Sequence, residues 1–168
     1  VERVSPTTQT TRLDYDPAGN LISTDQSGVT VNREYDAAGR LTAVRFPDPS
    51  EDITMSYDQG QYGQGRLTSI QDSSGLSQYT YDPLGRVIKD VRHMDNKSFA
   101  TGYGYDLSGQ LATMTYPSGL NVVYQRDASG RITRVIANRA LVAESVSAMP
   151  FGPYEAWTCG KRGFEIQR

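Results

Sequence analysis

Six aspartates are the residues whose types and spacing could most readily do chemistry in this 168-residue sequence. They recur every 20 to 24 residues, at Asp16, Asp36, Asp58, Asp82, Asp106 and Asp127. Paired carboxylates can act as general acid and base, and clusters of carboxylates can hold calcium. None of the six begins the alternating series of acidic ligands, ending in Glu, that a calcium-binding loop needs. Because each aspartate has the same local context, we expect the carboxylates to accept hydrogen bonds from backbone N–H groups of a turn.

His93 and Cys159 are the only histidine and the only cysteine. A single cysteine excludes an intrachain disulfide, and one residue of each kind excludes a Cys/His zinc site. A nucleophile and base pair would require these two residues, 66 positions apart, to meet. The sequence therefore predicts a non-catalytic protein with no cofactor and no metal.

Tyrosine directly precedes five of the six aspartates. These residues are Tyr15, Tyr35, Tyr57, Tyr81 and Tyr105; in the sixth copy Arg126 takes this position and Tyr124 lies two residues earlier. Such a series could be a stacking platform for sugars, with Trp157 as a further carbohydrate contact. The hydrophobic fraction is only 37% and includes 11 tyrosines, so we expect the rings mainly to pack on a sheet, each contributing roughly 2 kcal/mol when buried.

Arginine is the usual residue after the glycine that follows each aspartate. Arg40, Arg66, Arg86 and Arg131 could form a basic ladder, or could be solvated or pair across strands with carboxylates. The net charge is −2 and basic residues do not cluster, which argues against a nucleic-acid partner. No apolar stretch approaches the roughly 18 residues of a membrane span, and residues 1–11 lack the hydrophobic region of a signal peptide.

The elements that position these residues are predicted to be turns and strands. In Asp82-Pro83-Leu84-Gly85, Asp stands at the first position of a type I turn, Pro at the second and Gly at the fourth. The third copy inserts residues 59–64 between its Asp and Gly, a change that a surface turn absorbs. The glycines of the six copies are Gly19, Gly39, Gly65, Gly85, Gly109 and Gly130.

Alternation of apolar and polar residues predicts two short strands in each copy. Before each turn, apolar residues alternate with polar ones, as Ile53, Met55 and Tyr57 do in the third copy. A second turn follows the returning strand. The sequence thus predicts an all-β, antiparallel hairpin-repeat sheet. In the returning segment Leu67 and Ile70 have opposite parity, which indicates either a bulge or partial burial of both faces. Residues 138–148 could form a turn or two of helix.

The repeats divide the chain into three predicted parts. Residues 1–12 are a lead-in, residues 13–136 hold about six repeats, and residues 137–168 are a degenerate repeat that ends before the next turn. We therefore expect a piece of a longer protein, whose cut sheet edges could pair with another copy.

The motif Tyr-Asp-x-x-Gly-Arg-Leu, with its period near 21, resembles the YD repeat of rearrangement-hotspot (Rhs) proteins, insecticidal toxin-complex shells and teneurins. Residues 149–153 and 157–160 also resemble a segment of bacterial Rhs cores. The resemblance implies a spiralling β-shell that encloses a C-terminal toxin, so that the partners would be the rest of the shell and its cargo. It also implies a secreted or cell-surface location through bacterial export. The family's self-cleavage segment has no counterpart here.

Two functional hypotheses follow. The first is a non-catalytic structural fragment of such a shell, because a sheet of successive hairpins can extend indefinitely and so build wall area. The alternative is a carbohydrate- or receptor-binding module of an adhesion protein, which would require several exposed, coplanar aromatic rings on one face. An enzyme would require polar residues of different types gathered together outside the repeat positions. Residues 137–161, the least repetitive region, offer only Glu144 and Glu155 as a carboxylate pair.

Overall fold

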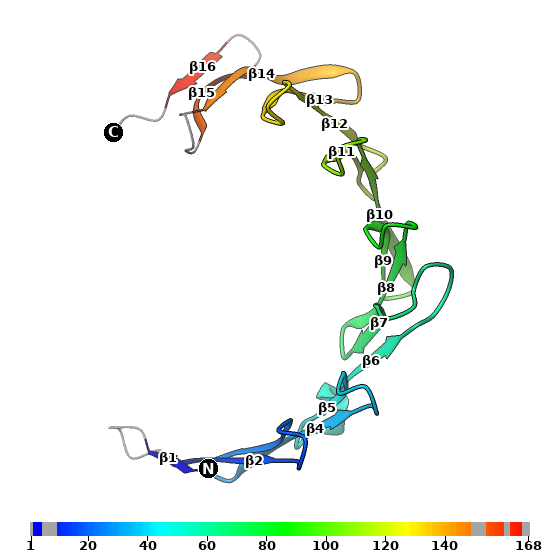
Figure 1. Cartoon of the computed structure of the whole chain (residues 1–168), viewed down its shortest axis with the longest axis vertical. Coiled ribbons are helices and arrows are strands. Elements are labelled where there is room, and N and C mark those ends of the chain that lie inside the picture. The colour runs from blue at the N-terminus through cyan, green and yellow to red at the C-terminus, as the bar shows by residue number, and fades with distance from the viewer. Residues whose placement is uncertain (1, 5–9, 149–153, 160–161, 166–168) are drawn as a thin grey trace. The chain divides into compact units, whose positions relative to one another are not determined.

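The computed structural model describes residues 2–4, 10–148, 154–159 and 162–165. These residues form strands and one short 3-10 helix at Pro49–Glu51, and the order of the strands in the sheet is their order in the sequence (Figure 1). The strands are β1 (Glu2–Val4), β2 (Thr10–Tyr15), β3 (Leu21–Gln26), β4 (Val29–Tyr35), β5 (Leu41–Arg45), β6 (Ile53–Tyr57), β7 (Leu67–Asp72), β8 (Gly75–Tyr81), β9 (Val87–Met94), β10 (Lys97–Tyr105), β11 (Leu111–Thr115), β12 (Asn121–Arg126), β13 (Ile132–Ala137), β14 (Ala140–Ala148), β15 (Tyr154–Cys159) and β16 (Arg162–Glu165).

The predicted all-β, antiparallel hairpin-repeat architecture is confirmed. The chain divides into two compact units, each described here by itself. The first comprises residues 1–86 and 91–98, and the second comprises residues 87–90 and 99–168. This division falls within β9 and β10 and does not test the predicted boundaries at residues 12 and 136.

In the first unit, cross-strand pairing separates apolar from polar side chains. Residues directly opposite one another in an antiparallel pair lie on the same face of the sheet. One series of partners joins Leu13 to Thr24 and Thr24 to Val31, and the same face continues through Val44 opposite Ile53 and Met55 opposite Ile70. We call it the tyrosine face, because Tyr35, Tyr57 and Tyr81 have the same strand parity. The opposite face carries polar pairs such as Asn32 with Arg45 and Ser69 with Gln78.

The second unit repeats this segregation. Tyr103 pairs with Met114, Met114 with Val122, and Tyr124 with Val135, so these residues share its tyrosine face. Most apolar side chains are only half-buried. Among the described residues, the buried hydrophobic side chains are Ala43 in the first unit and Val122 in the second.

A bulge at the start of the returning strand β7 explains the parity of Leu67 and Ile70. Tyr57 pairs with Leu67 and Ser56 with Ser69, so Thr68 is the extra residue on β7. Thr68 is buried, and its hydroxyl donates to the carbonyl oxygen of Ser56 at 3.1 Å. The register shift brings both Leu67 and Ile70 opposite residues of the tyrosine face. The alternative of partial burial on both faces is therefore not needed. The same shift recurs before Tyr15, Tyr35, Tyr105 and Arg126.

The helix considered for residues 138–148 is wrong. Asn138 and Arg139 have φ values of 47° and 68°, the left-handed conformation used by both central residues of the tight type I′ hairpin turn. β14 (Ala140–Ala148) then pairs antiparallel with β13, with Arg134 opposite Glu144. Pairing along β13 satisfies the backbone of this segment and overrides its weak helical pattern, because sheet ladders and tertiary context outweigh local propensity.

Candidate functional site at the repeat corners

The repeated corner between two strands is closed by two backbone hydrogen bonds. In the second copy, the Gly39 amide donates to the carbonyl oxygen of Asp36 at 2.9 Å, as in a type I turn, and the Asp36 amide donates to the Arg40 carbonyl at 3.0 Å. Gly39 has a φ of 76°, which glycine adopts without steric cost. The first, fourth, fifth and sixth copies make the same two bonds. In the third copy, the Asp58 amide still donates to the Arg66 carbonyl, at 3.1 Å, across the insertion.

The aspartate carboxylate forms a second layer of bonds inside the corner. Asp36 Oδ1 accepts from the backbone amides of Ala38 and Arg40, each at 2.9 Å, and Oδ2 accepts from Arg40 Nε at 2.7 Å. Asp82 bonds Leu84 and Arg86 in the same pattern. The carboxylates at positions 16, 106 and 127 also accept from backbone amides of their own turns.

At Asp36, Asp58 and Asp82, hydrogen bonds to the carboxylate lower its pKa. The Arg40 backbone amide, followed by its side chain, lowers the pKa of Asp36 below its usual value. The pKa of Asp58 is lowered first by the Arg40 side chain and then by the Gly65 amide. For Asp82, desolvation is the largest effect and opposes ionisation, but the combined bonds from Arg86 and Leu84 still lower its pKa. Carboxylates held in this way serve as acceptors and are poorly suited to donate a proton at neutral pH.

The repeat tyrosines link each repeat to the one before it. The Tyr35 hydroxyl donates to the Leu21 carbonyl at 3.0 Å, and the Tyr57 hydroxyl to the Leu41 carbonyl at 2.7 Å. The later copies match, with Tyr81 bonding Leu67 at 2.5 Å and Tyr105 bonding Val87 at 2.7 Å. In each case the acceptor is the first residue of the preceding returning strand, so the carbonyl beside the corner is satisfied by the next repeat. Sequence reasoning placed the rings on the sheet but missed these bonds.

The long polar residue after the turn glycine links successive corners. Arg40 Nη1 and Nη2 donate to the two carboxylate oxygens of Asp58 at 3.0 and 2.7 Å, and its guanidinium lies 4.4 Å from the centre of the Tyr57 ring. Arg66 lies over Tyr81 at 5.7 Å and fills the space where a side chain at position 85 would begin. In the second unit, Gln110 occupies the corresponding space above Gly130. These contacts couple neighbouring corners.

A second polar cluster lies at the opposite ends of the strands in the first unit. Arg92 Nη2 donates to Asp72 Oδ1 at 2.6 Å, and His93 contacts Gln78 Oε1 through Nε2 and the Ser98 hydroxyl through Nδ1, at 3.0 and 2.8 Å. The cluster borders an open pocket of about 570 Å³ between the turns at residues 72–75 and 94–97. Arg92 is the first cause of the lowered pKa of Asp72. His93 is therefore engaged within its own unit.

The sixth corner departs from the others. Arg126 takes the tyrosine position, and its partner across β12 and β13 is Ile132. Its Nε and Nη1 atoms are buried and have no hydrogen-bond partner in the structure. Tyr124 lies on the same strand face and pairs with Val135. This is the copy that does not preserve the tyrosine link.

The aspartates are not brought together into a shared site. Each corner carboxylate described above bonds its own turn, although Arg40 also bridges Asp36 and Asp58. Over the described parts of the chain, no group of three or more His, Cys, Asp or Glu residues could hold a metal ion. No helix in those parts is long and apolar enough to span a membrane. Trp157 lies in β15 opposite Phe164, but its side chain is outside the described residues, as are residues 149–153.

Successive antiparallel hairpins with a repeated Tyr, Asp and Gly corner define a β-hairpin repeat protein. The family model described as RHS Repeat matches residues 15–51, 62–93 and 95–139, which together make up more than half of the sequence. The chain belongs to the RHS repeat family. The resemblance drawn from the sequence is thereby confirmed. No curated protein sequence matches the chain.

Solved structures show the same fold. A crystal structure of TcdB2-TccC3-Cdc42 aligns with a TM-score of 0.82 and 15% identity over 95% of this chain and 10% of the other. A crystal structure of TcdB2-TccC3 without its hypervariable C-terminal region gives 0.83 and 15% over 95% and 9%. The Photorhabdus luminescens Tc holotoxin pore with the TccC3-D651A mutation gives 0.78 and 16% over 94% and 9%. The chain thus spans about a tenth of the length of the solved chains that it matches.

Proposed function

We propose that this chain is a non-catalytic segment of an RHS shell that encloses a toxin or other cargo within a larger protein. The observation that carries the proposal is the repeated coupling between hairpins, in which four repeat tyrosines, Tyr35, Tyr57, Tyr81 and Tyr105, each bond a carbonyl of the previous repeat. A barrier needs such continuity, because a gap between strands would expose unpaired backbone groups and let solvent or protease through.

The chemistry of the corners supports a structural role. The carboxylates of Asp36 and Asp82 accept several hydrogen bonds each, and the Arg40 guanidinium contacts two carboxylates and an aromatic ring. A group that is saturated with intramolecular partners contributes to rigidity and has little capacity left to bind or activate a substrate. The repeat positions therefore supply a wall and its corners.

The parent protein is proposed to be exported from bacteria, as a secreted or cell-surface protein. Its remaining wall segments and its C-terminal cargo would be the partners of this chain. The fold shared with the Tc toxin structures supports the proposal. This chain also spans only about a tenth of the length of those solved chains. The division into a lead-in, about six repeats and a degenerate repeat remains a prediction.

Protease protection in the longer polypeptide tests the proposal. A recognition sequence for a site-specific protease is placed in the insertion at residues 59–64, which is exposed except at Gly63. In a second protein the same sequence is placed in the C-terminal cargo region. We expect rapid cleavage in the insertion, and cleavage of the cargo region only after the wall is unfolded in denaturant. Equal cleavage rates at the two positions under native conditions would show that the wall does not enclose the cargo.

Carbohydrate or receptor binding remains the alternative prediction. It requires several exposed rings on one face, whereas Tyr35, Tyr57, Tyr81 and Tyr105 are partly buried and donate their hydroxyls to the backbone. Titration with simple sugars, followed by Trp157 fluorescence, tests this alternative. Saturable binding would favour the alternative over a purely structural role.

A further inference from the structure

The only histidine of the chain lies in a row of three hydrogen-bonded side chains on neighbouring strands of the first unit. His93 of β9 contacts the amide oxygen Oε1 of Gln78, on β8, through Nε2 at 3.0 Å, and the hydroxyl of Ser98, on β10, through Nδ1 at 2.8 Å. An amide oxygen can only accept a hydrogen bond, so Nε2 carries the ring hydrogen. Nδ1 of the neutral ring is therefore the acceptor for the Ser98 hydroxyl.

This row places a hydroxyl, a base and a group that orients the base in the order that activates a nucleophile. A serine hydroxyl attacks a carbonyl carbon only weakly unless a base removes its proton, and the base must present the correct nitrogen. Gln78 holds the ring with Nδ1 toward Ser98. No other serine in the described parts of the chain has an imidazole partner, because His93 is the only histidine and both of its ring nitrogens are engaged.

The Ser98 hydroxyl is within reach of a small molecule from solvent. Ser98 is exposed, and together with His93 it borders the open pocket of about 570 Å³ between the two hairpin turns. This volume lies within the range of roughly 300–1,000 Å³ that is typical of pockets for small molecules. Leu76 and Met94 line the same pocket and supply apolar surface for a short acyl chain. The pocket therefore places a small reagent beside the hydroxyl that His93 can deprotonate.

We propose that Ser98 is a covalent modification site, at which the hydroxyl accepts an acyl group from an activated ester bound in this pocket. Nδ1 of His93 takes the proton from Ser98 Oγ, and Oγ forms a bond to the carbonyl carbon of the ester. The bond from that carbon to the leaving oxygen then breaks, and His93 gives the proton to the leaving oxygen. The products are O-acyl Ser98 and a free alcohol or phenol. One acyl group per chain is a modification and not turnover, so the proposal goes beyond the wall role without contradicting it.

Acetylation of the 168-residue chain by p-nitrophenyl acetate tests the proposal. Release of p-nitrophenolate is followed by absorbance, and peptide mass spectrometry locates the acetyl group. Hydroxylamine removes an acetyl ester from serine and leaves an acetyl amide on lysine, so the two kinds of product are distinguished. Ser73 is the internal control, because it is exposed and borders the same pocket but has no imidazole partner. A positioned base contributes roughly 10²–10⁴-fold, so we expect Ser98 to react at least about tenfold faster than Ser73.

Variants of the other two residues test how the hydroxyl is activated. His93→Gln removes the base and should lower the acetylation rate at Ser98 to that at Ser73. Gln78→Met removes the acceptor for Nε2 and should slow acetylation at Ser98 by about tenfold, because the ring is no longer held in the required tautomer. Gln78→Glu keeps an acceptor oxygen and should retain the parent rate, as expected for a positioning residue. Comparison of the two Gln78 variants does not depend on how well His93→Gln folds.

Equal acetylation rates at Ser98 and Ser73, a rate at Ser98 that His93→Gln does not change, or equal slowing in both Gln78 variants would overturn the proposal. The row would then be a cross-strand hydrogen-bond ladder that only holds the hairpins together. Faster acetylation at Ser98 that falls in His93→Gln and in Gln78→Met, but not in Gln78→Glu, supports the proposal. A negative result leaves the protease-protection test unaffected, because that test measures enclosure and does not depend on Ser98.

Discussion

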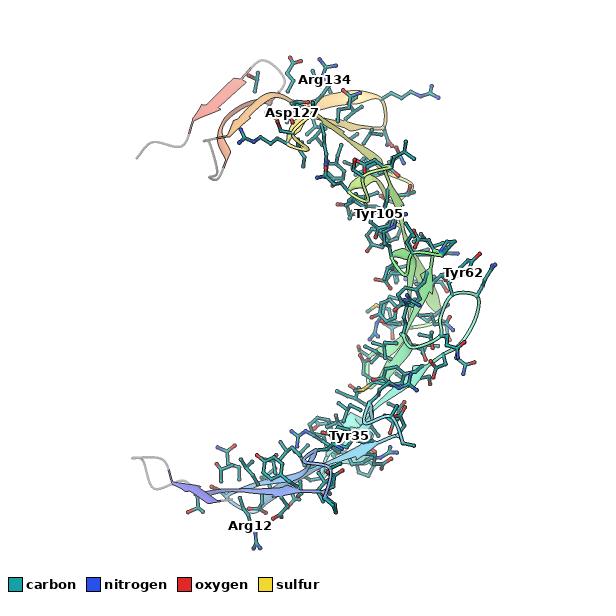
Figure 2. All side chains as sticks on the ribbon, viewed as in Figure 1. Arg12, Tyr35, Tyr62, Tyr105, Asp127 and Arg134 are labelled. Atoms are coloured by element: carbon teal, nitrogen blue, oxygen red, sulfur yellow. The ribbon has the colours of Figure 1, made fainter. Side chains whose placement is uncertain are left out.

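Arg40 and Asp58 form a two-pronged ion pair that joins two successive corners of the sheet. Nη1 and Nη2 of Arg40 reach the two carboxylate oxygens of Asp58 at 3.0 and 2.7 Å, while Nε of the same side chain bonds Asp36 at 2.7 Å. Figure 2 draws the side chains of the strands as sticks and labels Tyr35, the residue before Asp36. The two hydrogen-bonded carboxylates raise the pKa of Arg40 further above its already high value. In the sequence Arg40 is one of several arginines that follow a turn glycine. In the structure Arg40 links two successive repeats.

The first prediction concerns the geometry of this link. Arg40→Lys keeps the charge but replaces a planar fork of donors by a single ammonium group, which cannot hold Asp36 Oδ2 and both oxygens of Asp58 together. We expect the melting temperature to fall nearly as far as in Arg40→Gln. Arg131→Lys, at an exposed arginine in the same position of the sixth copy, is the control and should change the melting temperature little. A lysine variant as stable as the parent would show that charge alone is sufficient.

The second prediction concerns the tyrosine links. Tyr57→Phe removes only the hydroxyl that donates to the Leu41 carbonyl, and we expect a loss of roughly 0.5–1.5 kcal/mol in the free energy of unfolding. Tyr105→Phe should behave alike, because Tyr105 bonds Val87 in the same way. Tyr116→Phe is the control, at an exposed tyrosine outside the repeat position, and should be nearly neutral. Urea unfolding curves measure all three, and equal effects would contradict a special role for the repeat hydroxyls.

The third prediction separates backbone strain from crowding at the corner glycines. Gly39 and Gly85 have nearly the same φ, 76° and 79°, but a Cβ at Gly39 would meet nothing within 4 Å, whereas one at Gly85 would lie 2.1 Å from Arg66 Nη2. Gly39→Ala should cost about 1–2 kcal/mol for the left-handed backbone alone. Gly85→Ala should cost more, because Arg66 must also leave its bonds to the Tyr62 and Gln64 carbonyls. Equal losses of stability in Gly39→Ala and Gly85→Ala would mean that Arg66 moves away from position 85 at no cost.

The fourth prediction concerns the loss of stability at acidic pH. The pKa values of Asp36, Asp58 and Asp72 are lower in the folded chain than the value near 3.9 of an unfolded aspartate. Between the folded and unfolded pKa values the unfolded chain binds more protons, so stability rises with pH through this window. We expect the stabilisation to be complete above about pH 5 and to be lost as the pH falls below about 4.

Chemical unfolding at a series of pH values measures this dependence. Asp36→Asn, which cannot ionise, should reduce the steepness of the loss between pH 5 and the acid limit. A slope that is the same in the parent and in Asp36→Asn would show that this corner carboxylate does not contribute.

The sequence by itself determined the strands, their antiparallel hairpin order and the corners, because these follow from local rules. Alternation with period two marks a strand, and Asp and Gly at fixed positions mark a turn wherever they occur. The weak helical pattern of residues 138–148 gave a wrong prediction because that segment is decided by its pairing with β13. A local sequence pattern carries no information about such pairing.

Only the tertiary structure decided which repeat holds the hydrogen-bond partner of each polar side chain. The bonds from Tyr57 to Leu41 and from Arg40 to Asp58 connect residues 16 and 18 positions apart, and they exist because adjacent hairpins lie side by side. The bulge at Thr68, which brings Leu67 and Ile70 to one face, likewise depends on register with β6. A sequence pattern specifies which side chains can bond, whereas pairing of the strands fixes the distances that decide whether they do.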